Sequence, residues 1–289
     1  MTVPPVLPAD GVDVHAHVLD PTRPAAPGAR YAPTAGRGIA EYAAHLDALG
    51  LRRGVLVTAT AHGVDNAPLL DAIAAAPDDR RGVAVVEPGV GDAELDRLVA
   101  GGVRAVRVQD LYPGGTPLAA LSTLGPRLAA RGGHAEVWTD VAAHLAWLPQ
   151  AVAEAGCPVV LDHLGFADPT DTCVDDALVE LARAGHAWIT VSGAFRHLPA
   201  LPVTVARSVL TPRVRRLVDA VPERLLWGSD WPYVGIDGET PTPEGLVAEV
   251  LAWFPDADLR RRVLVENPEE CYGFAPAARR GTAGGQLPR

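Results

Sequence analysis

The chain has 289 residues, of which 48% are hydrophobic, enough for one large domain or two small ones. Its formal net charge of −10 argues against nucleic acid or an anionic membrane as the main partner. No apolar run approaches the roughly 20 residues of a membrane-spanning helix, and segment 1–11 lacks the basic and apolar regions of a signal peptide. Three cysteines without metal-type or redox-type spacing favour a reduced, cytoplasmic setting.

Short apolar runs alternate along the chain with amphipathic, alanine-rich segments. The runs are rich in Val, Ile, Leu or Trp and are bounded by glycine, proline or charge, which indicates strands. Strands are predicted over residues 11–18, 53–60, 82–88, 103–109, 134–140, 158–165, 187–194 and 224–231. Helices are predicted over residues 67–76, 92–100, 117–131, 142–155, 174–184, 212–220 and 243–254.

Eight apolar strands that alternate with helices predict an α/β fold whose parallel strands are buried on both faces. An open, doubly wound sheet usually has a glycine-rich phosphate turn after its first strand, and none is present. We therefore predict a single (β/α)8 TIM barrel over residues 11–274. Residues 1–10 are expected to form a loose leader and residues 275–289 a flexible tail.

Two histidines near the start of the chain share one face of the first predicted strand. His15 and His17 are two residues apart, so they point to the same side, which in a barrel can be the lumen. Functional groups of such barrels gather at the carboxyl ends of the strands, where His163 also lies. Asp162 is adjacent to His163, so we expect only one of the two to enter the lumen, and His163 is chosen. The alternative is that these are ordinary core histidines.

Other strand ends carry further candidates. Asp230 follows the apolar eighth strand, and a buried carboxylate is costly unless it is paired or ligated. Arg107 and Arg196 follow apolar runs and could clamp a substrate carboxylate, although surface positions are the usual alternative. Residues that could line the pocket are His62, for which a turn role is an equal alternative, Trp138 and Tyr31.

Six motifs occur in an order that identifies a family. They are DVHAH (13–17), HGVDN (62–66), VVLDHLG (159–165), VSGAFR (191–196), LLWGSDWP (225–232) and ENPEECYGF (266–274). With them the chain resembles the amidohydrolase-2 branch of the amidohydrolase superfamily over about residues 11–274. Within it, the chain is most similar to the 2-pyrone-4,6-dicarboxylate lactonase group, which includes sugar lactonases.

The resemblance implies a (β/α)8 barrel that hydrolyses a lactone or a related carbonyl compound. It assigns His15, His17, His163 and Asp230 to the core of the site, and Arg196 and Arg107 to carboxylate binding. Two departures argue against the dicarboxylate itself as the substrate: Phe195 stands where the group commonly has tyrosine, and segment 109–118 lacks that lactonase's arginine-bearing pattern.

One divalent metal, such as zinc, could be held by four of these residues. His15, His17, His163 and Asp230 offer nitrogen and oxygen ligands and leave an open position. The chain has no lysine, and its fifth strand ends without lysine, histidine or glutamate, so a second metal is not expected. The group also implies members that work without metal, and both alternatives stay open. No organic cofactor is expected.

The function predicted from these residues is hydrolysis of a small, anionic lactone by water. Asp230 would act as general base, and the three histidines would polarise the carbonyl, with or without a metal. A serine nucleophile is disfavoured because no G-x-S-x-G motif occurs. Alternatives are a metal-dependent decarboxylase, a lactone isomerase and a binding barrel without activity. The expected partner is a small molecule, and a homo-oligomer is left open.

Overall fold

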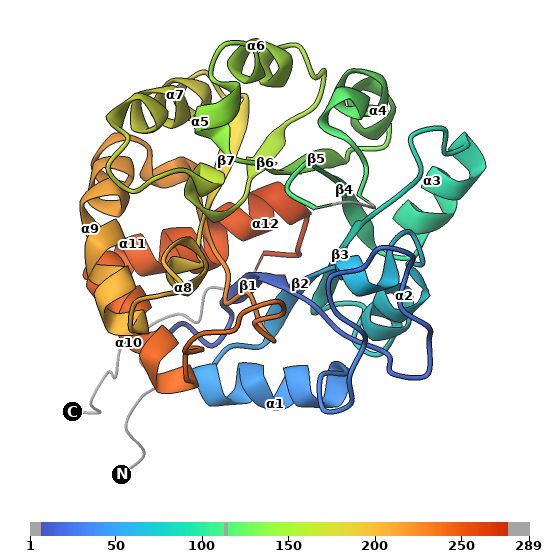
Figure 1. Cartoon of the computed structure of the whole chain (residues 1–289), viewed down its shortest axis with the longest axis horizontal. Coiled ribbons are helices and arrows are strands. Elements are labelled where there is room, and N and C mark those ends of the chain that lie inside the picture. Colours follow the sequence, from blue (N-terminus) through green and yellow to red (C-terminus); the bar gives the residue numbers. More distant parts are fainter. Residues whose placement is uncertain (1–6, 113–114, 277–289) are drawn as a thin grey trace, which may run out of the picture.

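The computed structural model describes residues 7–112 and 115–276 of the chain. Eight parallel strands lie in the spatial order of the sequence, and each hydrogen-bonds to the next (Figure 1). The strands are β1 (Val12–Ala16), β2 (Arg53–Val57), β3 (Arg80–Ala84), β4 (Val103–Gln109), β5 (His134–Trp138), β6 (Val159–Leu161), β7 (Ala187–Val191) and β8 (Leu225–Trp227).

The sheet closes on itself between its first and last strands. The amide of Asp230 donates to the carbonyl of His15 at 2.8 Å, and the amide of His17 donates to the carbonyl of Trp231 at 2.7 Å. With helices around the strands (Figure 1), this arrangement confirms the predicted (β/α)8 barrel.

The helices surround the barrel and differ from the prediction in several places. They are α1 (Ile39–Leu49), α2 (Ala67–Ala74), α3 (Asp92–Ala100), α4 (Leu121–Ala129), α5 (Val141–His144), α6 (Leu148–Ala153), α7 (Thr172–Arg183), α8 (Ala194–His197), α9 (Val203–Ala220), α10 (Pro243–Trp253), α11 (Ala257–Arg261) and α12 (Asn267–Tyr272). Short turns are η1 (Thr60–His62), η2 (Leu118–Ala120), η3 (His163–Phe166), η4 (Pro222–Arg224) and the π-helical η5 (Arg262–Glu266). No described helix is both long and apolar enough to cross a membrane.

Two of the predicted helices had the wrong extent, and one helix was not predicted. The segment predicted as one helix over 142–155 is two helices, α5 and α6. The helix predicted over 212–220 begins nine residues earlier, at Val203, because Pro212 lies inside α9 and does not start it. Helix α1 was not predicted, although Gly50 ends it in the left-handed conformation that glycine favours.

The barrel lumen has an apolar lower half. Side chains from several strands form one buried cluster with Tyr272, the last residue of α12, and with Phe274, which lies just beyond that helix. A second, larger cluster lies between the outer faces of the strands and the helices. The lower lumen is therefore a packed core, which leaves chemistry to the carboxyl ends of the strands.

Part of the predicted leader packs against the barrel. Leu7 is buried, and the carbonyl of Asp10 accepts a hydrogen bond from the Arg53 guanidinium at 2.8 Å. Residues 7–10 are therefore not loose, because Arg53 and the core hold them. Residues 1–6 of the leader and 277–289 of the predicted tail lie outside the described residues.

Candidate active site

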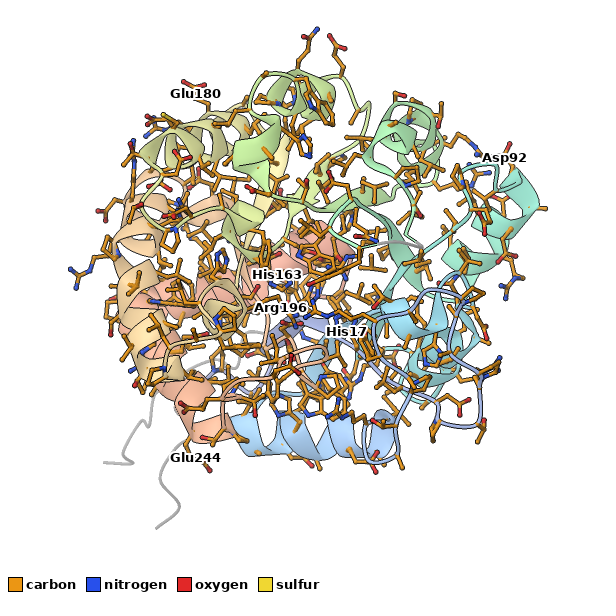
Figure 2. All side chains as sticks on the ribbon, viewed as in Figure 1. His17, Asp92, His163, Glu180, Arg196 and Glu244 are labelled. Carbon is orange, nitrogen blue, oxygen red and sulfur yellow. The ribbon has the colours of Figure 1, made fainter. Side chains whose placement is uncertain are left out.

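A cavity lies at the carboxyl ends of the strands, where the fold places catalytic residues. Its lining residues come from loops and strand ends around the whole barrel. They are His17, Arg30, Tyr31, Thr60, Arg107, Tyr112, Trp138, His163, Arg196, Asp230, Val234 and Gly235. Figure 2 shows His17, His163 and Arg196 near the centre of the molecule, while Asp92, Glu180 and Glu244 lie at its edge.

The two histidines of β1 reach the lumen because the strand is irregular. Val12 and Val14 belong to the lumen cluster, so strict alternation would turn the next residue outward. The register against β2 shifts between Asp13 and Ala16, as at a β-bulge. His15 therefore lies beside His163, with ring centroids 4.8 Å apart, and His17 is 5.1 Å from His15. His15 and His17 thus point to the same side, as predicted, and the bulge is what turns that side toward the lumen.

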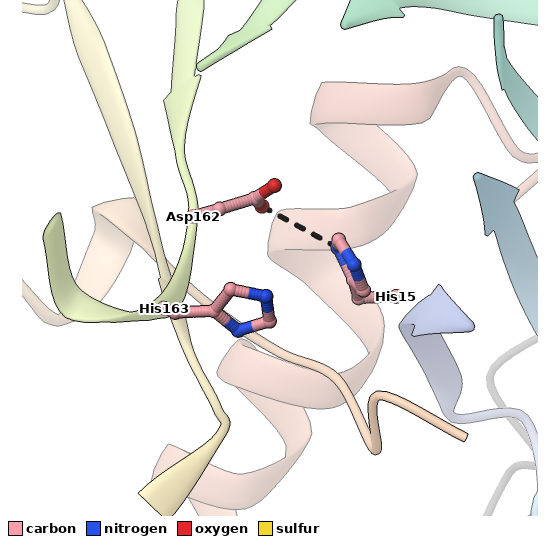
Figure 3. Close-up of side chains that lie close together, drawn as sticks. All are labelled: His15, Asp162 and His163. Carbon is pink, nitrogen blue, oxygen red and sulfur yellow. Dashed lines mark ion pairs between the residues drawn. The ribbon is translucent and has the colours of Figure 1, made fainter. Parts of the chain in front are cut away.

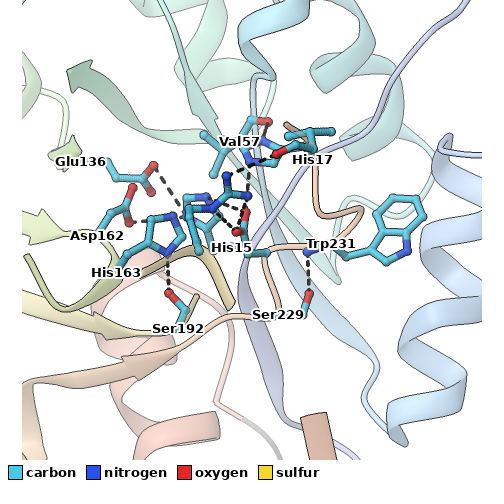
Figure 4. A network of polar contacts seen from close by, with 12 residues as sticks. His15, His17, Val57, Glu136, Asp162, His163, Ser192, Ser229 and Trp231 are labelled. Atoms are coloured by element: carbon cyan, nitrogen blue, oxygen red, sulfur yellow. Dashed lines mark hydrogen bonds and ion pairs between the residues drawn. The ribbon is translucent and has the colours of Figure 1, made fainter. Parts of the chain in front are cut away.

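Asp230 is the carboxylate that faces these histidines. It is buried, its Oδ1 lies 3.7 Å from His17 Nε2 and 4.0 Å from His15 Nε2, and its Oδ2 accepts from Arg196 Nε at 2.6 Å (Figure 4 shows the surrounding network). Burial by itself would raise the pKa of Asp230, but Arg196 and His17 outweigh it and hold that pKa well below its ordinary value. Asp230 is thus an ionised carboxylate with one oxygen anchored and the other directed at the histidines.

Asp162 and His163 both enter the site, so the expectation that only one of them could was wrong. The strand ends at Leu161, and His163 has a φ of 49°, in the left-handed region. This turn rotates His163 to the same side as Asp162, which alternation in a regular strand forbids. Asp162 Oδ1 lies 3.4 Å from His15 Nδ1, as Figure 3 shows.

A buried ion-pair network beneath the cavity was missed by the sequence analysis. Arg107 donates to Asp162 Oδ2 at 3.0 Å, and its Nε lies 3.5 Å from Glu136 Oε1. Glu136 points into the lumen two residues before Trp138, the end of β5. The alternation of His134, Glu136 and Trp138 along that strand was the available signal, because a buried glutamate flanked by apolar residues needs a partner.

The two carboxyl groups of this network differ in their protonation. Burial raises the pKa of Glu136 well above its ordinary value, and the neighbouring Asp162 adds to that effect. Burial also opposes ionisation of Asp162, but His15 and Arg107 outweigh it, and the pKa of Asp162 is lowered. At neutral pH the pair therefore holds a neutral Glu136 and an ionised Asp162, so a single negative charge, that of Asp162, balances the positive charge of Arg107.

Hydrogen bonds orient the histidine rings. His17 Nδ1 lies 2.9 Å from the carbonyl of Val57, which can only accept, so Nδ1 carries the proton and Nε2 presents a lone pair to the site. His163 Nδ1 lies 2.8 Å from Ser192 Oγ. Burial lowers the pKa of His17 to about 4 and that of His163 well below its ordinary value, so both rings are neutral at pH 7.

The donor atoms are suited to a single cation. Potential ligand atoms of His15, His17 and Asp230 all lie within 4.8 Å of one another, and so do those of His15, Asp162 and His163. Both nitrogens of His15 are buried without a hydrogen-bond partner among the described residues. Neutral imidazoles and an ionised carboxylate are the ligands that divalent metals such as zinc take in open, catalytic sites. His163 stands in the second group, not with His17 and Asp230.

The predicted substrate-binding residues divide into two sets. Arg107, Arg196, Trp138 and Tyr31 line the cavity. His62 does not line it; its Nε2 accepts a hydrogen bond from the amide of Asp20 at 3.2 Å, which favours the alternative turn role. Cavity residues that the sequence analysis did not name are Arg30, Thr60, Val234 and Gly235. They lie in loops that carry no recognisable motif.

The chain is similar to known proteins over most of its length. Residues 12–274 match the model of the amidohydrolase family. The chain is 33% identical over 285 residues to 2-pyrone-4,6-dicarboxylate hydrolase of Comamonas testosteroni, covering 92% of this chain and 91% of that protein. It is 27% identical over 282 residues to D-galactarolactone isomerase of Agrobacterium fabrum, covering 94% of each.

A solved structure shows the same fold. The crystal structure of a probable 2-pyrone-4,6-dicarboxylic acid hydrolase from Acinetobacter baumannii, with citric acid bound, superimposes with a TM-score of 0.79 at 27% identity. The match covers 92% of this chain and 100% of that one. The family and the enzyme class predicted from the motifs are both supported by these relatives.

Proposed function

Because the chain belongs to the amidohydrolase family, we propose that it is a hydrolase that opens the ring of a small, anionic lactone by attack of water. The observation that carries the proposal is the pairing of Asp230 with the histidines: an ionised, buried carboxylate lies 3.7 Å from His17, and both residues line the cavity. A named relative hydrolyses a lactone of a dicarboxylate, and a second relative binds citric acid, which supports an anionic substrate.

Asp230 is suited to act as the general base. Arg196 holds Oδ2, so Oδ1 remains to accept a proton from the attacking water. The water oxygen bonds to the lactone carbonyl carbon, and the carbonyl oxygen takes the negative charge. When the tetrahedral intermediate collapses, the ring C–O bond breaks, and Asp230 returns the proton to the leaving oxygen. The products are a hydroxyl and a carboxylic acid on one open chain, and the acid releases its proton to solvent to become a carboxylate.

His163 is placed to stabilise the developing oxyanion. If the Ser192 hydroxyl donates to Nδ1, the proton of this neutral ring is on Nε2, where it can be donated to the carbonyl oxygen. Arg107 and Arg196 contact the substrate through the N–H groups that their carboxylates leave free, since each guanidinium has five donors. Trp138 and Tyr31 pack against the ring of the lactone.

A divalent metal, zinc by its ligand chemistry, would be held by His15, His17 and Asp230, with His163 as the further predicted ligand. When bound, such an ion would polarise the substrate carbonyl as a Lewis acid. Metal analysis of the purified protein, with activity measured before and after chelation, tests whether the site uses one.

The test of the base is Asp230→Asn. We expect kcat on carboxylated lactones to fall by about 1000-fold or more, because general-base catalysis and the anchored carboxylate are both lost. Asp219→Asn, an exposed position on α9 that does not line the cavity, is the matched control and should keep its activity. Asp230→Asn leaves the buried Arg196 charge without its partner and should lower the unfolding temperature, so kcat is measured well below it, whereas the control should unfold like the natural protein. Near-normal turnover by the Asp230 variant would refute the assignment.

Isomerisation is the second candidate, because a relative of similar coverage is a lactone isomerase. The two reactions differ in the fate of water. Hydrolysis in water labelled with oxygen-18 places one labelled oxygen in the product carboxylate. Isomerisation moves the acyl carbon to another hydroxyl of the same molecule, so it incorporates no label. Release of carbon dioxide would instead indicate decarboxylation, and no turnover of any lactone would indicate a binding barrel.

A further inference from the structure

We propose that Arg30, on the loop between β1 and α1, binds the substrate's carboxylate and gives the enzyme its preference for anionic over neutral lactones. The proposal rests on the proposed function of the cavity and adds the residue that selects the substrate class. Arg30 lines the cavity and also the adjoining mouth, a more open hollow that is lined by Arg196 and Asp237 as well.

The charges at the site are balanced before Arg30 is counted. Arg196 pairs with Asp230 at 2.6 Å, and Arg107 pairs with Asp162 at 3.0 Å. The two arginines that sequence alone indicated as carboxylate binders therefore already carry carboxylate partners from the protein.

Arg30 differs from both because it forms no ion pair with a carboxylate of the described residues. Asp237 also lines the mouth, but no ion pair joins it to Arg30 in the described part of the chain. A lactone carboxylate would thus find one unmatched guanidinium, at the point where the cavity meets the mouth. Guanidinium groups bind carboxylates through two parallel hydrogen bonds, which suits this role.

A neutral partner already holds Arg30 in place. Its Nη1 donates to the hydroxyl of Tyr112 at 2.6 Å, and its guanidinium lies 5.1 Å from the centre of the Tyr112 ring. The Tyr112 ring lies 5.0 Å from Trp138, over which Arg107 sits at 4.6 Å. One wall of the cavity is therefore a stack in which two aromatic rings lie between two arginines.

The stack orients Arg30 without neutralising it. The Tyr112 hydroxyl occupies one of its five N–H donors, and the rest remain for a ligand. A carboxylate held at Arg30 would lie toward the mouth, which leaves the lactone carbonyl for the deeper part of the cavity. That part contains His17, His163 and Asp230. This order places the recognised group away from the reacting group, as selective binding of the substrate requires.

The test compares two lactones that differ only in charge. The probes are 5-oxotetrahydrofuran-2-carboxylate and its carboxamide, assayed with the full-length protein and with Arg30→Gln. We expect kcat/KM for the carboxylate to fall by about 10- to 100-fold, mainly through KM. The value for the carboxamide should change less than about twofold. Arg30→Lys keeps the positive charge but loses the two parallel N–H donors of the guanidinium, so its loss of kcat/KM on the carboxylate should be intermediate.

Arg37→Gln is the matched control. It removes the same charge from the same loop, but Arg37 does not line the cavity, so both lactones should react as with the natural protein. Equal losses on the two lactones with Arg30→Gln, or no loss on either, would overturn the role of Arg30. If the natural protein opens neither lactone, the proposed function fails for this substrate class.

Citrate binding separates these failures. Isothermal titration with citrate measures carboxylate recognition without any turnover. We expect the natural protein and Arg37→Gln to bind citrate alike, and Arg30→Gln to bind it at least about tenfold more weakly. Unchanged binding by Arg30→Gln, or no measurable binding by the natural protein, would overturn the proposal whether or not a lactone is hydrolysed.

Discussion

At the scale of single residues, the site depends on two buried carboxyl groups that share one arginine. Arg107 contacts both Asp162, at 3.0 Å, and Glu136, at 3.5 Å, and all three side chains are buried. A buried charge is tolerated only with a partner, so the protein can ionise one of these carboxyl groups more readily than two. The raised pKa of Glu136 and the lowered pKa of Asp162 are the two sides of that constraint.

Substitution of these two residues by their amides should have unequal effects. Glu136→Gln replaces a group that is already neutral, so we expect a change of less than about 1 kcal/mol in unfolding free energy and activity within about threefold. Asp162→Asn leaves the Arg107 charge buried without its partner and should cost about 3–5 kcal/mol. Urea unfolding at pH 7 measures both. A larger effect for Glu136→Gln than for Asp162→Asn would reverse the assigned protonation.

At the scale of elements, closure of the barrel depends on a close approach of β1 to the segment that follows β8. A Cβ atom at Gly228 would lie 2.5 Å from the Cβ of His15 and 2.8 Å from its backbone nitrogen. Only glycine therefore lets the chain reach Asp230 while His15 keeps its bulged conformation. The two candidate catalytic residues are positioned against each other by this contact.

Gly228→Ala should push β1 away and disturb both residues. We expect a loss of about 2 kcal/mol or more of stability, because the clash is with backbone and Cβ atoms that cannot rotate away. Activity should fall at least about 100-fold even below the unfolding temperature, since misplacement of a catalytic group by about 1 Å is that costly. Gly89→Ala, where no atom lies within 4 Å of the added Cβ, is the control. Full activity in the Gly228 variant would contradict this account.

At the scale of the whole molecule, stability should depend on pH through a carboxyl group far from the chemistry. Glu249 on α10 is buried, and burial raises its pKa to about 8. In the unfolded chain the same group has its ordinary pKa of about 4.5. The folded state therefore binds a proton that the unfolded state has released between about pH 5 and pH 8, so this group makes stability fall as pH rises through that window.

The predicted slope is at most about 1.4 kcal/mol per pH unit between pH 5 and pH 8, with no contribution from this group below pH 4. Glu249→Gln should reduce the measured slope by that contribution and be more stable than the natural protein at pH 8, while Asp13, whose pKa burial raises to about 6, still contributes below pH 6. Glu244→Gln, on the same helix but exposed, should leave the slope unchanged. Urea unfolding at pH 5, 6.5 and 8 measures it. An identical slope in the Glu249 variant would show that another group is responsible.

Much of this molecule follows from local sequence alone. Alternation of apolar runs with helical segments predicts the barrel, because parallel strands that are buried on both faces have few other stable closures. The residue types at the strand ends, His15, His17, His163 and Asp230, predict where the chemistry gathers. Their order along the chain identifies the family. Each of these conclusions depends on periodicity or residue type, which a sequence states directly.

The tertiary structure decided what depends on backbone conformation and on partners distant in the chain. The bulge in β1 and the left-handed backbone at His163 determine which side chains enter the lumen, and neither is visible in a residue pattern. Arg107 had the residue type of a substrate clamp, but contacts with strands five and six show it bound to the protein's own carboxylates. Arg30 had no motif at all. Its significance comes from charge balance, which exists only once the chain is folded.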